Sequence, residues 1–516
     1  MHKPVCLRRD HEQKEQHHLP GTVEKIIESP FPNEPEKAQI AVEGADHLYR
    51  EIRIDNMLTT EDGEEVRLKL GRRLKSRWKR RTRLQFPEAA INRLQPWCHR
   101  ASHSGQGGFL RQTQSAKPPN LTPHQRQTVL DQRRSLKMAV SAHAYVRGNT
   151  LKFYEWLQSL DRGRLPEGPA IWICGDCHVG NLGPVANAEG NVEIEIRDLD
   201  QTVIGNPAHD LIRLALSLAT AARGSDLPGV STALMMEEVI AGYAEALGNP
   251  EEQPKPSGKA TEPIQFVLKQ ALKRKWRHLA EERIKNVKPS IPLGKCFWVL
   301  TKGERREIAR LFDSEDVRML ITSLRHRNNK SLVEVLDASY WMKGCSSLGK
   351  LRFAVLVEVG DHKKSNLCLV DIKEAVRAAA PSWSDARMPR DNAKRVVKGA
   401  RSLSPFLGER MLAADLLGRP VVLRELLPQD LKLEMDRLTR DEIVASARFL
   451  ASVVGKAHAR QMDESMRRSW TAELQRNRSK KLDAPSWLWT SVVDLVAMHE
   501  TAYLEHCRRY ALAAAE

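Results

Sequence analysis

The sequence predicts an α+β fold with more than one domain, and three observations support this prediction. The chain has 516 residues, well beyond the ~250–300 residues at which a single hydrophobic core stops growing. Its composition, 41% hydrophobic and 28% charged residues, is typical of an ordinary globular protein. Segments with a period of two and segments with a helical period occur in different parts of the chain, which indicates both strands and helices.

Residues 1–70 predict a small β module. Alternating polar and apolar side chains at residues 49–54 and 66–70 have the period of half-buried strands, and Asp62-Gly63 between them is typical of a hairpin turn. Residues 71–122 are rich first in arginine and then in serine, glutamine, glycine and proline, without sustained periodicity. We therefore expect a linker there.

The linker carries much of the positive charge. The net charge is +17, and residues 72–100 contain ten lysines and arginines against one acidic residue, Glu88. Such a stretch repels itself, so a solvated linker is the simplest interpretation. A salt-dependent contact with nucleic acid is the minor alternative, because no zinc finger or aromatic platform for bases accompanies the charges.

A mostly helical part is expected over residues 123–330. Helical periodicity is visible at residues 126–146 and 151–160. A short apolar run at residues 170–173 predicts a strand that leads into the polar sequence Cys174-Gly-Asp-Cys-His178.

A β-rich part is expected over residues 331–430, and C-terminal helices that pack on the helical part over residues 431–516. Apolar residues recur at helical spacing between residues 441 and 461. Turns with glycine separate the strand-like runs of the β-rich part, which are residues 331–343, 351–358 and 367–373.

Two classes of protein are excluded by what the sequence lacks. No uncharged apolar run approaches the ~20 residues that cross a bilayer, and residues 1–12 lack the apolar core of a secretory signal. We therefore expect no membrane partner, a cytoplasmic location and mostly free thiols among the eight cysteines.

The sequence Cys174-Gly-Asp-Cys-His178 has three interpretations. As C-x-x-C-H it is the pattern of covalent haem attachment, and as C-x-x-C it is the pattern of a redox pair or of half a zinc site. Haem attachment of this type requires export, and the six other cysteines provide no second closely spaced pair for zinc. The third interpretation starts from the side chains that carry oxygen.

These side chains follow an order that phosphoryl transfer requires. Asp176 and Asn181 come directly after the predicted strand, and Asp198 and Asp200 are supplied by the next hairpin. One carboxylate orients an attacking hydroxyl, while an amide and a carboxylate hold Mg²⁺ on nucleotide phosphates. Asp210, which follows in Gly205-Asn-Pro-Ala-His-Asp210, is expected to cap a helix or to orient the loop.

This order and spacing resemble the kinase-like phosphotransferases of the aminoglycoside and choline kinase type. Their catalytic loop reads H-G-D-x-H-x-x-N and is followed by I-D-W-x-D and G-D-P-x-x-D-L. The chain from about residue 141 also resembles the bacterial domain-of-unknown-function family 2252, itself kinase-like, over roughly three quarters of its length. The matching segments are residues 141–148 for S-P-F-x-F-x-R-G, 172–183 for G-D-x-H-x-x-N-F-G, 197–201 for N-D-F-D-E and 371–375 for V-K-E-A.

The resemblance implies a permuted protein-kinase-like fold with two lobes. A mostly helical catalytic lobe would be encoded first and an antiparallel-sheet lobe that covers the nucleotide second, with residues 421–428 as the hinge between them. ATP and Mg²⁺ would be the cofactors, and the acceptor hydroxyl is unknown. The implied catalytic residues are Asp176 and His178, the metal ligands are Asn181, Asp198 and Asp200, and the nucleotide contacts are Gly344, Ser346, Gly349, Lys373 and Arg147.

Departures from the family pattern leave alternatives open. Ser346 replaces the second glycine of a phosphate-covering loop, and Gln201 and Arg197 replace a glutamate and an asparagine beside the metal. For Lys373 we find only Glu409 as a weak acidic partner. We favour an enzyme that transfers a phosphoryl group. A catalytically silent kinase-like binding module and a nucleotidyl transferase are the alternatives.

Overall fold

The computed structural model consists of two compact units, Met1–Gly108 and Phe109–Ala514. Among the described helices, none is both long and apolar enough to cross a membrane. The structure describes residues 18–27, 36–42, 51–56, 58–59, 65–67, 69, 73–77, 121–224, 229–252, 254–256, 261–273, 290–294, 296–323, 327, 331–344, 348–360, 366–427, 439–475 and 484–512.

The first unit is a small β module. Its described strands are β1 (His18–Ile27), β2 (Lys37–Val42), β3 (Glu51–Asp55), β4 (Leu58–Thr59), β5 (Glu65–Val66) and β6 (Arg73–Arg77). One antiparallel sheet has the order β3-β2-β1-β6, and β4 pairs with β5. Because β6 pairs with β1, the module extends past the boundary that we expected at residue 70. The basic residues of β6 concealed this strand in the sequence.

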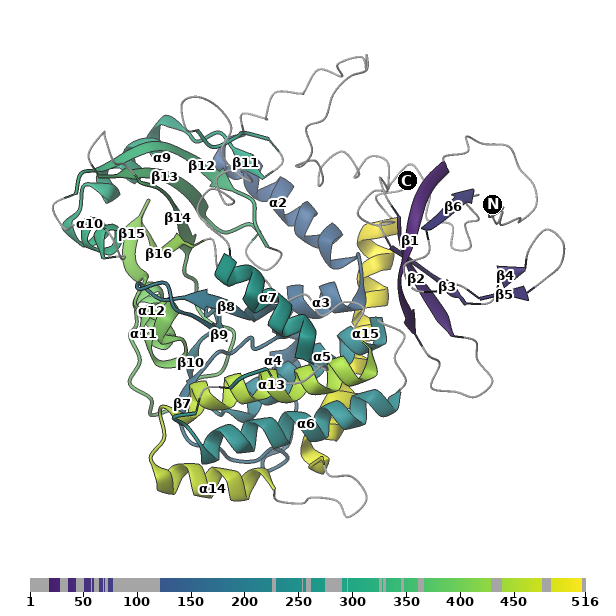
Figure 1. Cartoon of the computed structure of the whole chain (residues 1–516). Coiled ribbons are helices and arrows are strands. Elements are labelled where there is room, and N and C mark those ends of the chain that lie inside the picture. The colour runs from purple at the N-terminus through teal and green to yellow at the C-terminus, as the bar shows by residue number, and fades with distance from the viewer. Residues whose placement is uncertain are drawn as a thin grey trace. The chain divides into compact units, whose positions relative to one another are not determined.

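The second unit combines helices with a six-stranded antiparallel sheet, which confirms the predicted α+β class (Figure 1). The order of the sheet is β11-β12-β13-β14-β16-β15. The strands are β11 (Phe297–Trp298), β12 (Val333–Trp341), β13 (Arg352–Val359), β14 (Asn366–Glu374), β15 (Met411–Leu416) and β16 (Arg419–Leu426). The expected hinge at residues 421–428 is therefore mostly strand, in which Leu423 pairs with Ile372 of β14.

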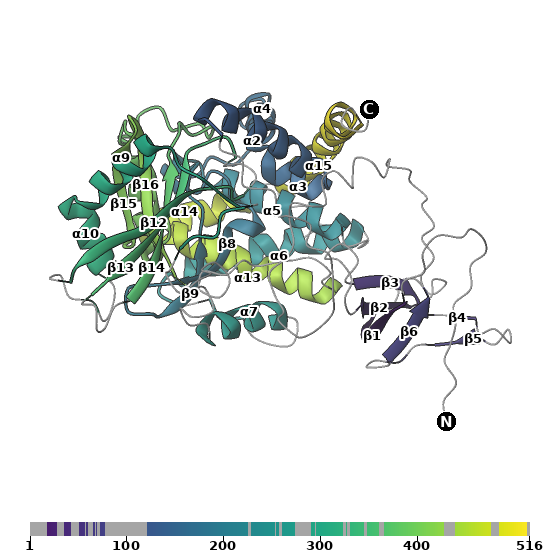
Figure 2. The same cartoon turned by 90° about the horizontal axis from the view of Figure 1, so that it is seen from above.

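Helices α2 (Pro123–Met138), α9 (Lys302–Phe312) and α10 (Glu315–Thr322) pack with one face of this sheet (Figures 1 and 2). Leu130, Ile308 and Ile321 are buried there in one cluster with the strands. Arg126 of α2 donates two hydrogen bonds to Glu304 of α9, at 2.9 and 2.7 Å. These three helices come from the range 123–330, so part of the sequence that we assigned to the helical part packs on the sheet instead.

The helical stretch predicted over residues 126–146 is two helices, α2 and α3 (Ala142–Gly148). Ser141 caps α3, since its hydroxyl accepts a hydrogen bond from the backbone N–H of Ala144 at 3.0 Å. This break separates the helix that covers the sheet from those that form the helical part.

The helical part surrounds one large apolar core. Its helices are α3, α4 (Thr150–Gln158), α5 (Ala208–Gly224), α6 (Gly229–Gly248), α7 (Glu262–Lys273), α13 (Arg440–Ala459), α14 (Glu464–Leu474) and α15 (Ser486–Cys507). Helices α6 and α13 lie side by side (Figure 1). Glycines permit this approach, because a Cβ on Gly242 would collide with the carbonyl oxygen of Arg448, and one on Gly455 would lie 2.8 Å from that of Tyr243.

Short strands and two helices connect the sheet to the helical part. The strands are β7 (Ile171–Ile173), which pairs with β10 (Val203–Gly205), and β8 (Leu182–Ala186), which pairs with β9 (Val192–Ile196). Helices α11 (Asn392–Leu403) and α12 (Pro405–Gly408) follow β14, and α11 contacts β7, β15 and β16. The polar residues of interest lie on the loops that follow β7 and β9.

Candidate functional site

The loop that follows β7 is held in place by Asp210. Gly175 has a φ of +75°, and a Cβ there would collide with the carbonyl oxygen of Gln201, so this position requires glycine. Asp210, in the first turn of α5, accepts hydrogen bonds from the backbone N–H groups of Cys174 at 2.7 Å and Gly175 at 2.9 Å. It also lies 3.2 Å from Nε2 of His458 on α13. Asp210 thus orients the loop, which is one of the two roles that we expected for it.

The Asp176 carboxylate is buried and fixed at both oxygens. Oδ1 accepts a hydrogen bond from Nε of Arg213 at 2.8 Å, and Oδ2 accepts one from the hydroxyl of Thr150 at 2.9 Å. Arg213 is fully buried and also donates to the carbonyl oxygen of Val146 at 2.7 Å. Each carboxylate oxygen has a second lone pair, so each oxygen of Asp176 can accept one more hydrogen bond in this orientation.

His178 and Arg147 lie beside the same loop. Burial lowers the pKa of His178 to about 3, so its imidazole is neutral at physiological pH. Its Nδ1 has no hydrogen-bond partner in the described part of the chain. The Arg147 guanidinium lies near Gly180, because a Cβ on that glycine would be 2.8 Å from Nη2. Arg147 is thus a cation next to the expected catalytic loop.

Asn181 stands opposite the segment that carries Asp198. Its carbonyl oxygen accepts a hydrogen bond from the backbone N–H of Arg197 at 2.7 Å, which extends the β8-β9 ladder. Its side-chain Nδ2 donates to the carbonyl oxygen of Asp176 at 2.9 Å. This hydrogen bond fixes the amide and leaves Oδ1 as the remaining acceptor of the side chain.

Lys373, at the end of β14, meets the two aspartates that follow β9. Its Nζ lies 3.0 and 3.2 Å from the two carboxylate oxygens of Asp198 and 2.5 Å from Oδ2 of Asp200. The lysine is encoded about 170 residues after its partners, as the spacing 198 to 373 shows. The structure therefore brings together the lysine and acidic residues that the sequence assigned to one site.

The side chains of Asp198, Asp200 and Lys373 shift one another's pKa values. Burial alone would raise the pKa of Asp198, but the Lys373 ammonium holds it well below its usual value. Burial and the neighbouring Asp198 carboxylate raise the pKa of Asp200. Burial opposes the charge on Lys373, and the two carboxylates more than compensate, so its pKa is raised. Lysine and Asp198 form an ion pair, and Asp200 is the most easily protonated member.

A second ion pair supports Lys373 on the sheet. Arg352 of β13 stands opposite Lys373 and donates to Asp371 at 2.9 and 2.6 Å. Arg424 of β16 lies 3.6 Å from the same carboxylate and donates to the carbonyl oxygen of Arg197 at 3.1 Å. The sheet is thereby joined to the loop that carries Asp198.

One known family matches the part of the chain that contains all of these residues. The family described as "Uncharacterized protein conserved in bacteria (DUF2252)" matches residues 126–509. The chain belongs to this family. The match begins in α2 and includes every residue of the Asp176 and Lys373 clusters. No curated protein and no solved structure matches the chain. The predicted resemblance to family 2252 is confirmed, and the resemblance to kinase-like enzymes stays a prediction.

The glycine segment of the DUF2252 chain contacts α2 in the described residues. Gly344 and Gly349 have φ values of +83° and +91°. The carbonyl oxygen of Gly344 accepts a hydrogen bond from Lys137 at 2.9 Å, and a Cβ on Gly349 would lie 2.6 Å from Nε2 of Gln127. Ser346 lies outside the described residues. The structure thus gives these glycines a turn-forming role and leaves their contact with phosphate a prediction.

The two cysteines of this loop form a buried pair. Ligand atoms of Cys174, Cys177 and Asp210 lie within 4.8 Å of one another, which is the only such group among the described residues. The hydrogen bond with Cys177 and burial raise the pKa of Cys174 well above its usual value, so it stays a thiol. Asp210 already accepts two backbone hydrogen bonds. This donor set fits a closed thiol pair better than a tetrahedral zinc site, which needs four ligands.

Sequence analysis missed Arg213 and Thr150. Arg213 interrupts the apolar run of α5 three residues after Asp210, and a lone arginine in a buried helix signals a buried carboxylate partner. Thr150 carries no such signal, because only the fold places it beside Asp176. Glu409, the expected partner of Lys373, instead accepts a hydrogen bond from the backbone N–H of Ala188 at 2.7 Å.

Proposed function

We propose that this DUF2252 chain is an ATP- and Mg²⁺-dependent phosphotransferase that acts on a hydroxyl acceptor. The observation that supports the proposal is the contact of Lys373 with Asp198 and Asp200 at 2.5–3.2 Å. In enzymes that transfer phosphoryl groups, a lysine on a sheet contacts the nucleotide phosphates and a loop aspartate binds the metal ion.

The oxygen-bearing side chains fit magnesium. Mg²⁺ prefers one or two carboxylates together with phosphate and water oxygens. Asp198 is the most exposed member of the cluster, with 38% of its side chain accessible against 20% for Asp200 and 13% for Lys373. Asp198 and the Oδ1 atom of Asn181 would hold the metal, and Asp200 would assist. The bound metal ion would neutralise charge on the phosphates.

Lys373 would then change partner. When a cation binds Asp198, the ammonium loses one of the two carboxylates that it contacts now and becomes available to phosphate oxygens. Arg352 and Asp371 keep the lysine strand fixed during this exchange, since their ion pair is buried in the sheet. Arg147, beside Gly180, adds a second cation for the phosphates.

Asp176 would accept the proton of the acceptor hydroxyl. Arg213 and Thr150 fix the orientation of its carboxylate, which is what a general base needs, and one lone pair remains on each oxygen. The neutral His178 would pack under the loop and would not transfer the proton.

Magnesium-dependent ATP binding tests the proposal. We expect calorimetry to detect ATP binding by the intact chain in the presence of Mg²⁺, and the Asp198→Asn variant to bind at least about tenfold more weakly, since a carboxylate ligand is lost. The matched control is Asp415→Asn, which makes the same change at an exposed position of β15. If folded wild-type protein binds no ATP with any divalent metal, the proposal is wrong.

A catalytically silent nucleotide-binding module is the second candidate, and the Asp176–Arg213 ion pair favours it. Arg213 and Thr150 donate to the two oxygens of the Asp176 carboxylate at 2.8 and 2.9 Å, so the carboxylate already has a structural role in holding the loop. Turnover against a panel of small hydroxyl acceptors distinguishes the two candidates. If the chain is an enzyme, wild type transfers a phosphoryl group and the Asp176→Asn variant does not. If it is a binding module, wild type and the variant both bind ATP and neither transfers a phosphoryl group.

A further inference from the structure

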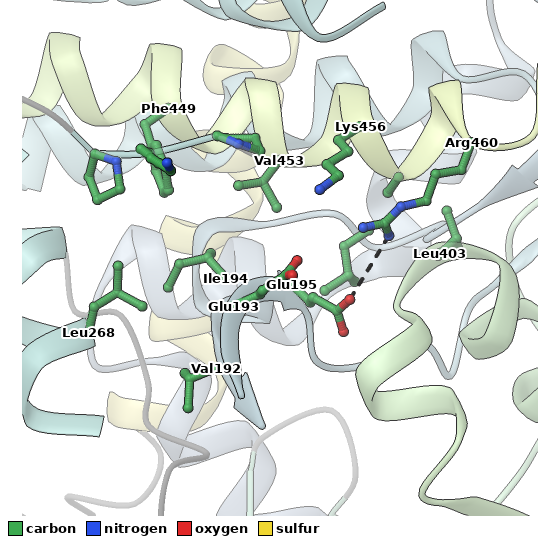
Figure 3. A pocket seen from close by; sticks show the side chains of 15 residues that line it. Val192, Glu193, Ile194, Glu195, Leu268, Leu403, Phe449, Val453, Lys456 and Arg460 are labelled. Carbon is green, nitrogen blue, oxygen red and sulfur yellow. Dashed lines mark ion pairs between the residues drawn. The ribbon is translucent and has the colours of Figure 1, made fainter. Parts of the chain in front are cut away.

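A cavity of about 320 Å³ lies between β9 and α13, and none of its lining residues takes part in the proposed phosphoryl transfer (Figure 3). We call it the Glu195 cavity. Its volume is at the small end of the ~300–1,000 Å³ that ligand pockets occupy. Residues 192–196 of β9, residues 254–256, Leu268 of α7, Leu403 of α11 and the α13 residues Phe449, Val453, Lys456, Ala457 and Arg460 line it.

One end of the cavity is apolar. Val192 and Leu268 lie at this end together with Phe449, and Val453 extends the apolar wall toward the middle (Figure 3). Phe449 and Val453 belong to the large core of the helical part. This end is suited to a small aliphatic or aromatic group.

The other end contains a buried carboxylate oxygen without a hydrogen bond. Glu195 is 3% exposed, and in the described part of the chain its Oε1 accepts no hydrogen bond. Nη1 of Arg460 lies 3.9 Å from Oε1, too far for a hydrogen bond. Oε2 accepts a hydrogen bond from the backbone N–H of Leu407 at 3.4 Å. A buried oxygen in this state lacks a donor, and the cavity beside it has room for one.

Two cations lie on the opposite wall. Lys456 lies in the last turn of α13, Arg460 follows the end of this helix, and Lys456 points into the cavity (Figure 3). The Lys456 ammonium forms no hydrogen bond or ion pair within the described residues, although the residue is only 7% exposed. Burial and the Arg460 charge lower the pKa of Lys456, as expected for a cation without a close partner. The ammonium is thus a donor without an acceptor.

Charges of both signs line the cavity. Apart from Lys255, which is exposed, the charged lining residues are Glu193 and Glu195 on β9 and Lys456 and Arg460 opposite them. A purely anionic ligand would therefore meet two carboxylates, and a purely cationic ligand would meet two or more cations. A ligand that carries one charge of each sign avoids both conflicts. The free acceptor on Glu195 and the free donor on Lys456 are placed to meet those two charges.

We propose that the Glu195 cavity binds a small zwitterion with an apolar side chain, of the class of the free aliphatic and aromatic amino acids. The ligand ammonium donates to Oε1 of Glu195, the ligand carboxylate accepts from Lys456 with Arg460 close by, and the side chain lies among Val192, Leu268 and Phe449. This inference does not depend on the proposed phosphoryl transfer, because it involves neither nucleotide nor Mg²⁺.

Amino acids, compared with two leucine analogues that each lack one charged group, test whether the cavity binds both charges of the ligand. Titration calorimetry and ligand-observed NMR are performed on the intact chain with L-leucine and L-phenylalanine. 4-Methylpentanoate, which lacks the amino group of leucine, and 3-methylbutylamine, which lacks the carboxylate, serve as comparison ligands. We expect an amino acid to bind and each comparison ligand to bind at least about tenfold more weakly, because each loses one charged hydrogen bond.

Two variants place the ligand in this cavity. Glu195→Gln is expected to weaken leucine binding at least about tenfold and to abolish the preference for leucine over 4-methylpentanoate, and Lys456→Met to abolish the preference over 3-methylbutylamine. Glu315→Gln on α10 is the control with an exposed glutamate. If neither leucine nor phenylalanine binds at ~10 mM, the proposal is overturned. Equal binding of either comparison ligand, or binding unchanged in both folded variants, would overturn it as well.

Discussion

Buried charges are matched around Lys373 and unmatched around Glu195. One ammonium contacts two carboxylates at 2.5–3.2 Å in the first cluster. In the second, Oε1 of Glu195 accepts no hydrogen bond from any described residue, and Nη1 of Arg460 is 3.9 Å away. A buried charge without a close partner is costly, and a close opposite charge offsets much of that cost. From this difference we expect the Lys373 cluster to be stable without a ligand and able to exchange partners, and we expect a ligand to complete the Glu195 cavity.

The largest expected effect comes from removing a partner in a matched pair. Arg213→Met leaves the Asp176 carboxylate buried beside an apolar side chain, so we expect the free energy of unfolding to fall by about 3–5 kcal/mol. Urea unfolding followed by circular dichroism measures this change. Arg223→Met on the same helix is the control, because Arg223 is 56% exposed in its pair with Glu500 and its loss should cost less than about 1 kcal/mol. Equal effects of the two variants would contradict the claim that burial makes the first pair important.

Replacing the Glu195 carboxylate is expected to raise the free energy of unfolding, by less than the loss expected for Arg213→Met. Burial raises the pKa of Glu195 to about 7 in the folded chain, from 4.5 in the unfolded chain. The folded state therefore favours the neutral acid, and stability is lost as the pH rises from about 4.5 through 7. Glu195→Gln is neutral at every pH and should be more stable than wild type at pH 8, by up to about 3 kcal/mol.

Thermal unfolding at two pH values checks this prediction. We expect a higher melting temperature for Glu195→Gln than for wild type at pH 8 and similar values at pH 4, where both side chains are neutral. The same shift at both pH values would show that packing, and not the buried charge, causes the change.

The matched cluster could be predicted from the sequence because its members lie in local motifs. Asp198 and Asp200 follow the predicted hairpin, Lys373 ends a predicted strand, and the family resemblance connected the two segments. The described structure places them in contact. The strand-like runs between turns with glycine also predicted β12, β13 and β14 to within a few residues.

The unmatched cavity could not be predicted in this way. Glu195 looks like an ordinary polar position in an alternating strand, and Lys456 and Arg460 look like polar positions at the end of a helix. They meet only because α13 packs beside β9, a contact between residues about 260 apart along the chain, as Glu195 and Arg460 show. The packing of α2 and α9 on the sheet escaped prediction for the same reason, because Arg126 and Glu304 are far apart in the sequence.

The smallest predicted effect tests whether the matched cluster can exchange its cation. Lys373→Met leaves Asp198 and Asp200 to repel each other, and we expect a loss of about 1–2 kcal/mol, less than for Arg213 because both carboxylates are partly exposed. If the two carboxylates bind Mg²⁺, adding the ion should restore the melting temperature of this variant and stabilise it more than wild type, where the lysine competes with the metal. Lys398→Met, at an exposed position of α11, is the control and should respond to Mg²⁺ as wild type does. An equal response of all three proteins to Mg²⁺ would show that the ion acts elsewhere, and the cluster would then be a structural ion pair.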